Sequence, residues 1–168
     1  MRPKVILSSN SSVMVAPVSL FSVITPVAFQ YASAAVTLGI VTEHSAARLA
    51  AERMSDSERE RLRSCFELSE FYMAKKNDER CGELDSEFHS IIFKASGSRH
   101  LYKILSDLHK NIKAYRRLSL SVPERAEKSI MEHREILEAI LSGNADEAER
   151  KSSLHIRNAL LNFKGLKP

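Results

Sequence analysis

The chain has 168 residues, of which 43% are hydrophobic, with five Gly, five Pro and no Trp. This length fits one compact domain with an appendage, and the low glycine and proline content argues against a turn-rich β-sandwich. The formal charge of +4 at pH 7 is mildly basic, but Lys and Arg mostly alternate with Glu and Asp, so the basic stripe of a nucleic-acid-binding surface is absent. Cys65 and Cys81 show neither CxxC nor metal-site spacing and are expected to be reduced thiols.

Residues 1–34 form an apolar segment that differs from everything after it. Following two basic residues near the start, no charged residue appears before Glu43. Three interpretations stay open: a secretory signal peptide with "ASA" at 32–34 as its cleavage site, a membrane span weakened by Pro17, Pro26 and many serines, or a start that is not native to the protein. The third is favoured, and residues 35–168 are expected to form the folded domain.

From about residue 34 the hydrophobic pattern becomes helical. The spacing of Ser55 and Glu58 is that of a capping box, Pro123 lies in the first turn of a helix, and Gly143 ends one. No segment alternates with a period of two for long enough to form a strand. The sequence therefore predicts an all-α antiparallel bundle of about six helices with short loops. The predicted helices span residues 34–54, 55–76, 78–96, 98–120, 123–143 and 145–163.

The segment "LDSEFHSII", residues 84–92, places Asp85 and His89 on the apolar side of the third predicted helix. Burial of an ionised carboxylate is costly unless the carboxylate is paired or coordinates a metal. The two residues are one helical turn apart, so both side chains reach toward one point.

Two further histidines lie on the buried stripes of the last two predicted helices. His133 precedes the turn near Gly143 by about ten residues and His155 follows it by about twelve, which places the two rings at similar heights in an antiparallel pair. Asp85, His89, His133 and His155 thus form a candidate metal site. One carboxylate and three imidazoles suit Zn²⁺, Ni²⁺, Fe²⁺ or Mn²⁺ better than Ca²⁺ or Mg²⁺.

An alternative to the metal site is that Asp85 pairs with an arginine and that the histidines are polar core residues bonded to one another. Two acidic residues that neighbour the candidate ligands, Glu87 and Glu132, are expected to point away from them. The other histidines show no comparable spacing and are expected to be surface or packing residues: His44, His100 and His109.

Three segments, residues 43–54, 84–105 and 131–156, resemble the effector-binding FCD domain of FadR-type regulators in the GntR superfamily. The elements "E…AA.LAA", "D..FH", "eH..il.Ai" and a final "H" occur in order over about 35–163. The resemblance implies a helical, non-enzymatic sensor of a small carboxylate effector, often metal-dependent and usually a homodimer. Matched by position, its metal ligands are the same four residues: Asp85, His89, His133 and His155.

The resemblance also sets expectations for the rest of the chain. Arg116 and Arg117 are candidates to complete a carboxylate clamp, the alternative being a solvated helix end. Family members usually carry an N-terminal winged helix-turn-helix, but nothing in residues 1–41 resembles one, so no direct DNA contact is expected from this chain. The family's arginine before the first-helix Glu is also missing, since Leu38 and Gly39 stand there.

A cytoplasmic, membrane-independent regulator domain is the leading hypothesis. An exported helical metal-binding protein, if residues 1–34 are a signal peptide, and a metalloenzyme built on the bundle are the alternatives.

Overall fold

The computed structural model describes residues 42–120 and 123–165, and every element in this part of the chain is an α-helix. The all-α prediction is confirmed, and the predicted ends of the last five helices agree with the structure within two residues. The first predicted helix is described over residues 42–53, and its earlier residues lie outside the described part. The others are α2 (Asp56–Ala74), α3 (Asp78–Ala95), α4 (Arg99–Leu120), α5 (Pro123–Leu141) and α6 (Ala145–Gly165).

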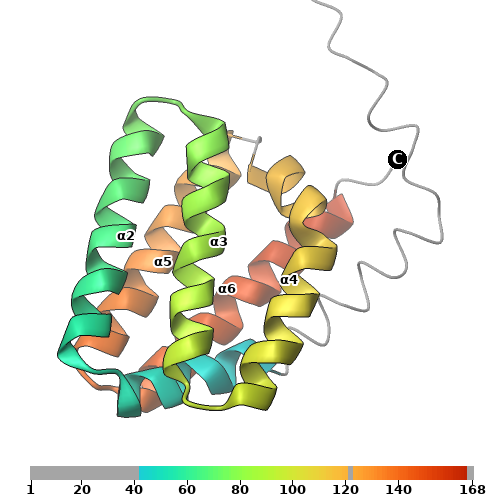
Figure 1. The fold of residues 1–168 in the computed structure, drawn as a ribbon. Helices are drawn as coiled ribbons and strands as arrows, with labels where there is room; N and C mark the ends of the chain where they lie inside the picture. Colours follow the sequence, from blue (N-terminus) through green and yellow to red (C-terminus); the bar gives the residue numbers. More distant parts are fainter. Residues whose placement is uncertain (1–41, 121–122, 166–168) are drawn as a thin grey trace, which may run out of the picture.

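From α2 to α6, successive helices run in opposite directions (Figure 1). The helices α2, α3 and α4 lie in front in this view, with α5 and α6 behind them, and the helix over 42–53 crosses one end of the bundle. The largest core cluster joins side chains from the 42–53 helix, α2, α3, α5 and α6. This packing brings the inner faces of α3, α5 and α6 together, which is the arrangement that the candidate metal site requires.

The helix ends form where the sequence signals predict them. Ser55 accepts a hydrogen bond from the backbone N–H of Glu58, whose side chain accepts one from the Ser55 N–H, so the capping box is complete. The Asn144 side chain accepts from the backbone N–H of Glu147 at the start of α6. Gly143 precedes it with φ +70°, a left-handed conformation that is strained for side chains other than glycine. The α5–α6 turn that sets the relative height of His133 and His155 is thereby fixed.

Arg59 ties three helices together at one end of the bundle. Its guanidinium donates to the backbone carbonyls of Ala51 at 3.1 Å and Leu141 at 3.0 Å, and also to that of Ile140. Carbonyls in the last turn of a helix lack partners within the helix. One half-buried side chain of α2 therefore satisfies the ends of the 42–53 helix and of α5.

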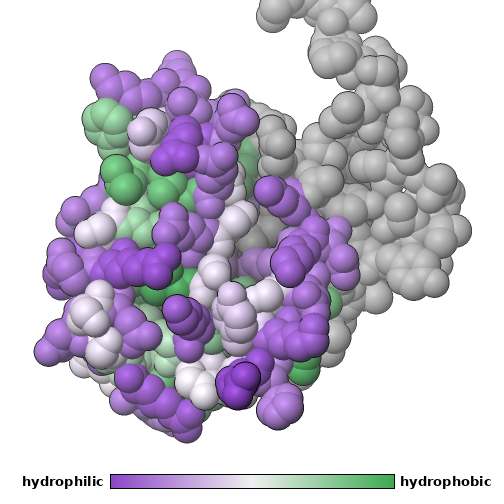
Figure 2. All heavy atoms as spheres, viewed as in Figure 1, coloured by the Kyte–Doolittle hydropathy of each residue, from purple (hydrophilic) through white to green (hydrophobic). Residues whose placement is uncertain are grey.

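The molecular surface in Figure 2 is mainly hydrophilic on the face shown, with hydrophobic residues gathered near the upper end of α2. Leu68 and Phe71 of that helix are about half exposed. Among the described helices, none is long and apolar enough to cross a lipid bilayer.

Replacing Arg59 with alanine is expected to lower the free energy of unfolding by about 2–3 kcal/mol, because several carbonyls lose a charged hydrogen-bond donor. Chemical denaturation measures the change. Arg63→Ala, one turn further along α2, is the matched control. Arg63 is 45% exposed and pairs with Glu60, so its loss is expected to cost below about 0.5 kcal/mol. Equal effects of the two substitutions would contradict the role of Arg59.

Candidate metal centre

Three of the four predicted ligands converge in the interior of the bundle. One ring nitrogen from each of His89, His133 and His155 lies within 4.8 Å of the other two. The rings come from α3, α5 and α6, and their residues are 3%, 2% and 4% exposed. The Nε2 atoms of His133 and His155 face each other at 3.3 Å. The three imidazoles therefore share one buried point.

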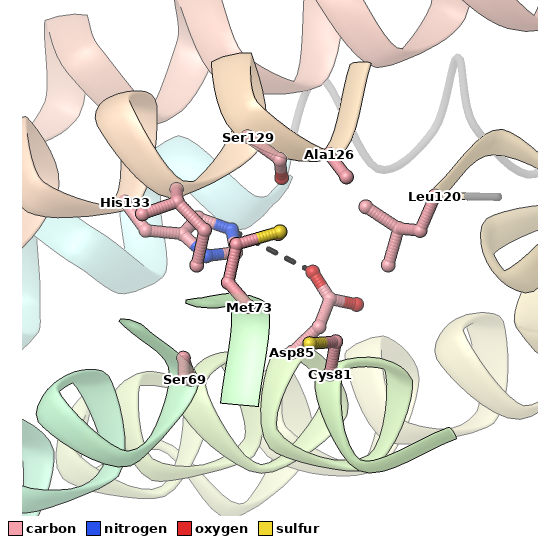
Figure 3. A pocket seen from close by; sticks show the side chains of 9 residues that line it. Ser69, Met73, Cys81, Asp85, Leu120, Ala126, Ser129 and His133 are labelled. Atoms are coloured by element: carbon pink, nitrogen blue, oxygen red, sulfur yellow. Dashed lines mark ion pairs between the residues drawn. The ribbon is translucent and has the colours of Figure 1, made fainter. Parts of the chain in front are cut away.

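Asp85, the fourth predicted ligand, borders this point from α3. It is 8% exposed, and its Oδ1 lies 3.7 Å from Nε2 of His133. Figure 3 shows the two side chains directed toward each other across a cavity, with Cys81 beside Asp85. Asp85 is buried as predicted, although it is not a member of the compact three-histidine group.

The cavity between Asp85 and His133 is small. It leaves about 20 Å³ for the centres of water-sized molecules, and its other lining residues come from α2, α3, α4 and α5. A space of roughly 10–15 Å³ on this measure holds one water molecule. The cavity thus has room for one or two waters, and an organic acid would have to displace some of the lining side chains to enter it.

Glu132 supports His155 from the side opposite to the cluster. Its Oε2 lies 2.7 Å from Nδ1 of His155, 3.0 Å from Nη2 of Arg125, and its Oε1 accepts from Asn158 at 2.9 Å. The expectation that Glu132 points away from the candidate ligands is therefore wrong. It precedes His133 in sequence and turns from that ring, but α6 packs on this side of α5 and brings His155 to it.

The contact with Glu132 defines which nitrogen of His155 carries a proton. An ionised carboxylate only accepts hydrogen bonds, so Nδ1 of His155 is the donor. In a neutral ring the lone pair then lies on Nε2, the atom that faces His133. His155 consequently presents to the shared point a nitrogen lone pair that could bind a metal.

A second buried carboxylate lies behind His89. Oε2 of Glu43, in the 42–53 helix, is 3.2 Å from Nδ1 of His89, while its Oε1 is 2.7 Å from Nε2 of His109. Glu43 is 3% exposed and the His109 side chain 12% exposed. The prediction for His109 needs correction in one respect: besides packing, its ring nitrogen, with Glu43 and His89, forms a second group with metal-ligand spacing.

Both carboxylates are held in the charged form. Burial raises the pKa of Glu43, but the adjacent His109, and then His89, outweigh it and hold that pKa well below the ordinary value. Burial likewise raises the pKa of Glu132, but the contacts with His155, Arg125 and Asn158 lower it by more, so the net shift of this pKa is downward. Two fixed negative charges therefore lie on the outer sides of the histidine cluster.

Aromatic side chains fix the planes of the rings. Phe88 stacks on His133 with a centroid distance of 4.6 Å and an interplanar angle of 20°. Phe93 meets His109 edge-on at 4.7 Å. The rings are thus held by packing as well as by hydrogen bonds, which reduces the reorganisation needed to bind a cation.

The donor set fits a divalent transition metal. With zinc–nitrogen bonds of about 2.0–2.1 Å, tetrahedral geometry places two ligand nitrogens about 3.3 Å apart. The separation of the His133 and His155 nitrogens already has this value, and His89 lies within reach of both. Metal-ligating histidines commonly direct their other ring nitrogen to a carboxylate. His155 and His89 do so, toward Glu132 and Glu43.

The remaining predicted positions divide into three outcomes. Glu87 pairs with Arg61 at the surface, as expected for a residue that points away from the site. His100 is exposed, and His44 is partly exposed near Glu149. Arg116 and Arg117 lie on α4, but their side chains are outside the described part of the structure, so their proposed contact with an effector stays a prediction.

Comparison with known proteins identifies the domain. The family model described as the FCD domain matches residues 41–158. A solved structure, Streptococcus agalactiae GntR, is similar with a TM-score of 0.71 and 25% sequence identity over 84% of this chain and 62% of that one. The present chain thus spans less than two thirds of the length of that structure. No curated protein matches. Since the family model covers most of the chain and all the residues of the histidine cluster, the chain belongs to the FCD domain family.

Proposed function

We propose that this FCD domain is the metal-dependent sensor of a GntR-type transcription regulator and that it binds a small organic acid. The observation that carries the proposal is the meeting of three buried imidazoles with a carboxylate behind each of two of them. Asp85, His89, His133 and His155 would hold a Zn²⁺, Ni²⁺, Fe²⁺ or Mn²⁺ ion. The bound ion supplies a positive charge that attracts a carboxylate.

The alternative of a purely hydrogen-bonded polar core accounts for only part of the site. A single proton between His133 and His155 explains their 3.3 Å contact. It does not explain why a third imidazole lies within 4.8 Å of both rings with Asp85 beside them, an arrangement that a shared cation would account for. The metal interpretation is therefore the more economical one.

A sensor is favoured over a metalloenzyme by the state of the acidic residues. Glu132 is the carboxylate that a metalloenzyme of this kind could use as a general base, but its oxygens already contact His155, Arg125 and Asn158. These contacts and its lowered pKa make it a poor proton acceptor. Positioning of a ligand, rather than turnover, is what these residues support.

Regulation would follow from a shift in helix packing when the effector binds. The three rings proposed to bind the metal come from three helices, and Glu43 connects His89 to a fourth. Effector binding at the cluster would therefore alter contacts of all four helices. Homodimerisation, a DNA-binding head elsewhere in the regulator, and action in the cytoplasm are part of this proposal and follow from the family.

Purified wild-type protein is expected to hold about one equivalent of transition metal per chain, whereas Asp85→Ala and His155→Ala should bind it at least about tenfold more weakly. Elemental analysis after dialysis against a defined metal buffer measures this. His100→Ala is the control, because His100 is exposed and is not a member of the histidine cluster. Equally low metal content in the wild type and both variants would exclude the metal site.

Metal removal is expected to destabilise the domain. At a free metal concentration about 100 times Kd, binding contributes about 2.7 kcal/mol, or roughly 10 °C in Tm for a domain of this size. Thermal unfolding with and without a chelator tests this. The shift should disappear in His155→Ala, and a Tm that ignores the chelator in wild type would argue for the polar-core alternative.

Glu132→Gln is expected to weaken metal binding about 10- to 100-fold while leaving all four ligands in place, because the amide no longer holds the Nδ1–H of His155 as a charged acceptor. Competition with a chromogenic chelator gives the affinity. The matched control on α5 is Glu135→Gln, whose carboxylate is half exposed and pairs with Lys151. If both substitutions leave the affinity unchanged, Glu132 does not orient the ligand.

A further inference from the structure

Glu43 is a buried carboxylate with one oxygen that its neighbours do not satisfy. It lies in the 42–53 helix and is 3% exposed. Its Oε1 is 2.7 Å from Nε2 of His109. Its Oε2 is 3.2 Å from Nδ1 of His89, an ion-pair distance, but it has no hydrogen-bond partner in the described part of the chain. Buried polar atoms of this kind are rare and costly, so Oε2 requires an explanation.

His89 and His109 are spaced like two ligands of one ion. Their ring centroids are 5.0 Å apart, and the centroid of His89 is equally 5.0 Å from that of His133 in the cluster. With zinc–nitrogen bonds of about 2.0–2.1 Å, the centre of a bound imidazole lies roughly 3.2 Å from the ion, so two tetrahedrally arranged rings lie about 5 Å apart. Glu43, His89 and His109, which we term the outer group, each offer a ligand atom within 4.8 Å of the other two. The outer group therefore has the dimensions and the donor atoms of a transition-metal site.

His89 belongs to both the outer group and the histidine cluster, which restricts how the two can be filled. Its Nδ1 faces Glu43, which leaves Nε2 for the cluster. A neutral imidazole carries a lone pair on one nitrogen and a proton on the other. His89 can therefore ligate an ion on one side at a time, and an ion in the outer group would deprive the cluster of this ligand.

We propose that Glu43, His89 and His109 form a second metal position, which takes the same divalent transition metals as the cluster and competes with it for His89. This inference rests on the proposed metal-dependent sensor function, in which the cluster is the stronger position. The cluster offers three imidazoles and Asp85, whereas the outer group offers two imidazoles and one carboxylate. The ion therefore prefers the cluster, the chain holds one ion in total, and the outer group binds it when the cluster is incomplete.

The test uses His133→Leu/His155→Leu, which removes two ligands of the cluster and leaves the outer group intact. Competition of this variant with a chromogenic chelator should show one equivalent of bound Zn²⁺, held at least about tenfold more weakly than in the wild type. Adding His109→Ala should weaken this remaining binding at least about tenfold again. Adding His100→Ala instead, which removes an exposed histidine of the same helix, should leave it unchanged.

His133→Gln/His155→Gln, which keeps polar side chains in the core, takes the place of the leucine variant if that variant fails to fold, with the same expected results. The absence of zinc binding in the folded variant, or binding that ignores His109→Ala, would overturn the outer position. A wild type that binds two equivalents at once would overturn the competition for His89. A wild type that binds zinc no more tightly than the variant would instead overturn the cluster, and with it the sensor function, while the effect of His109→Ala still decides the outer position.

Discussion

The domain depends on the burial of three imidazoles at one point between α3, α5 and α6. Packing polar rings in a helical core is unfavourable unless each ring nitrogen has a partner. The bundle provides partners on the outside with Glu132 and Glu43, which lie against His155 and His89. On the inner side, Nε2 of His133 and Nε2 of His155 face each other at 3.3 Å beside Asp85, where the proposed cation would lie.

The carboxylates behind the rings extend this arrangement to the rest of the molecule. Glu43 connects α3 to the 42–53 helix and, through His109, to α4. Glu132 connects α6 to Arg125 at the start of α5. A change of charge at the histidine cluster would therefore act on the 42–53 helix through Glu43. It would act on the buried Arg125 through Glu132.

Much of the fold could be predicted from the sequence because its signals are local. Helix ends follow from caps such as Ser55, and the inward direction of His133 and His155 follows from the 3.6-residue period. Contacts between helices could not be predicted, because they depend on how the helices pack and leave no local signal in the sequence. The position of Glu132 on its own helix does not reveal that α6 covers it, and no spacing relates Glu43 to His109, which lie 66 residues apart.

X-ray absorption spectroscopy of the metal-loaded protein tests the central claim most directly, since it counts the ligands around the ion. The account predicts a single ion bound by three imidazole nitrogens and one carboxylate oxygen, with no sulfur from Cys81 despite its place beside Asp85. A first shell with fewer than three imidazoles, or one containing sulfur, would contradict it.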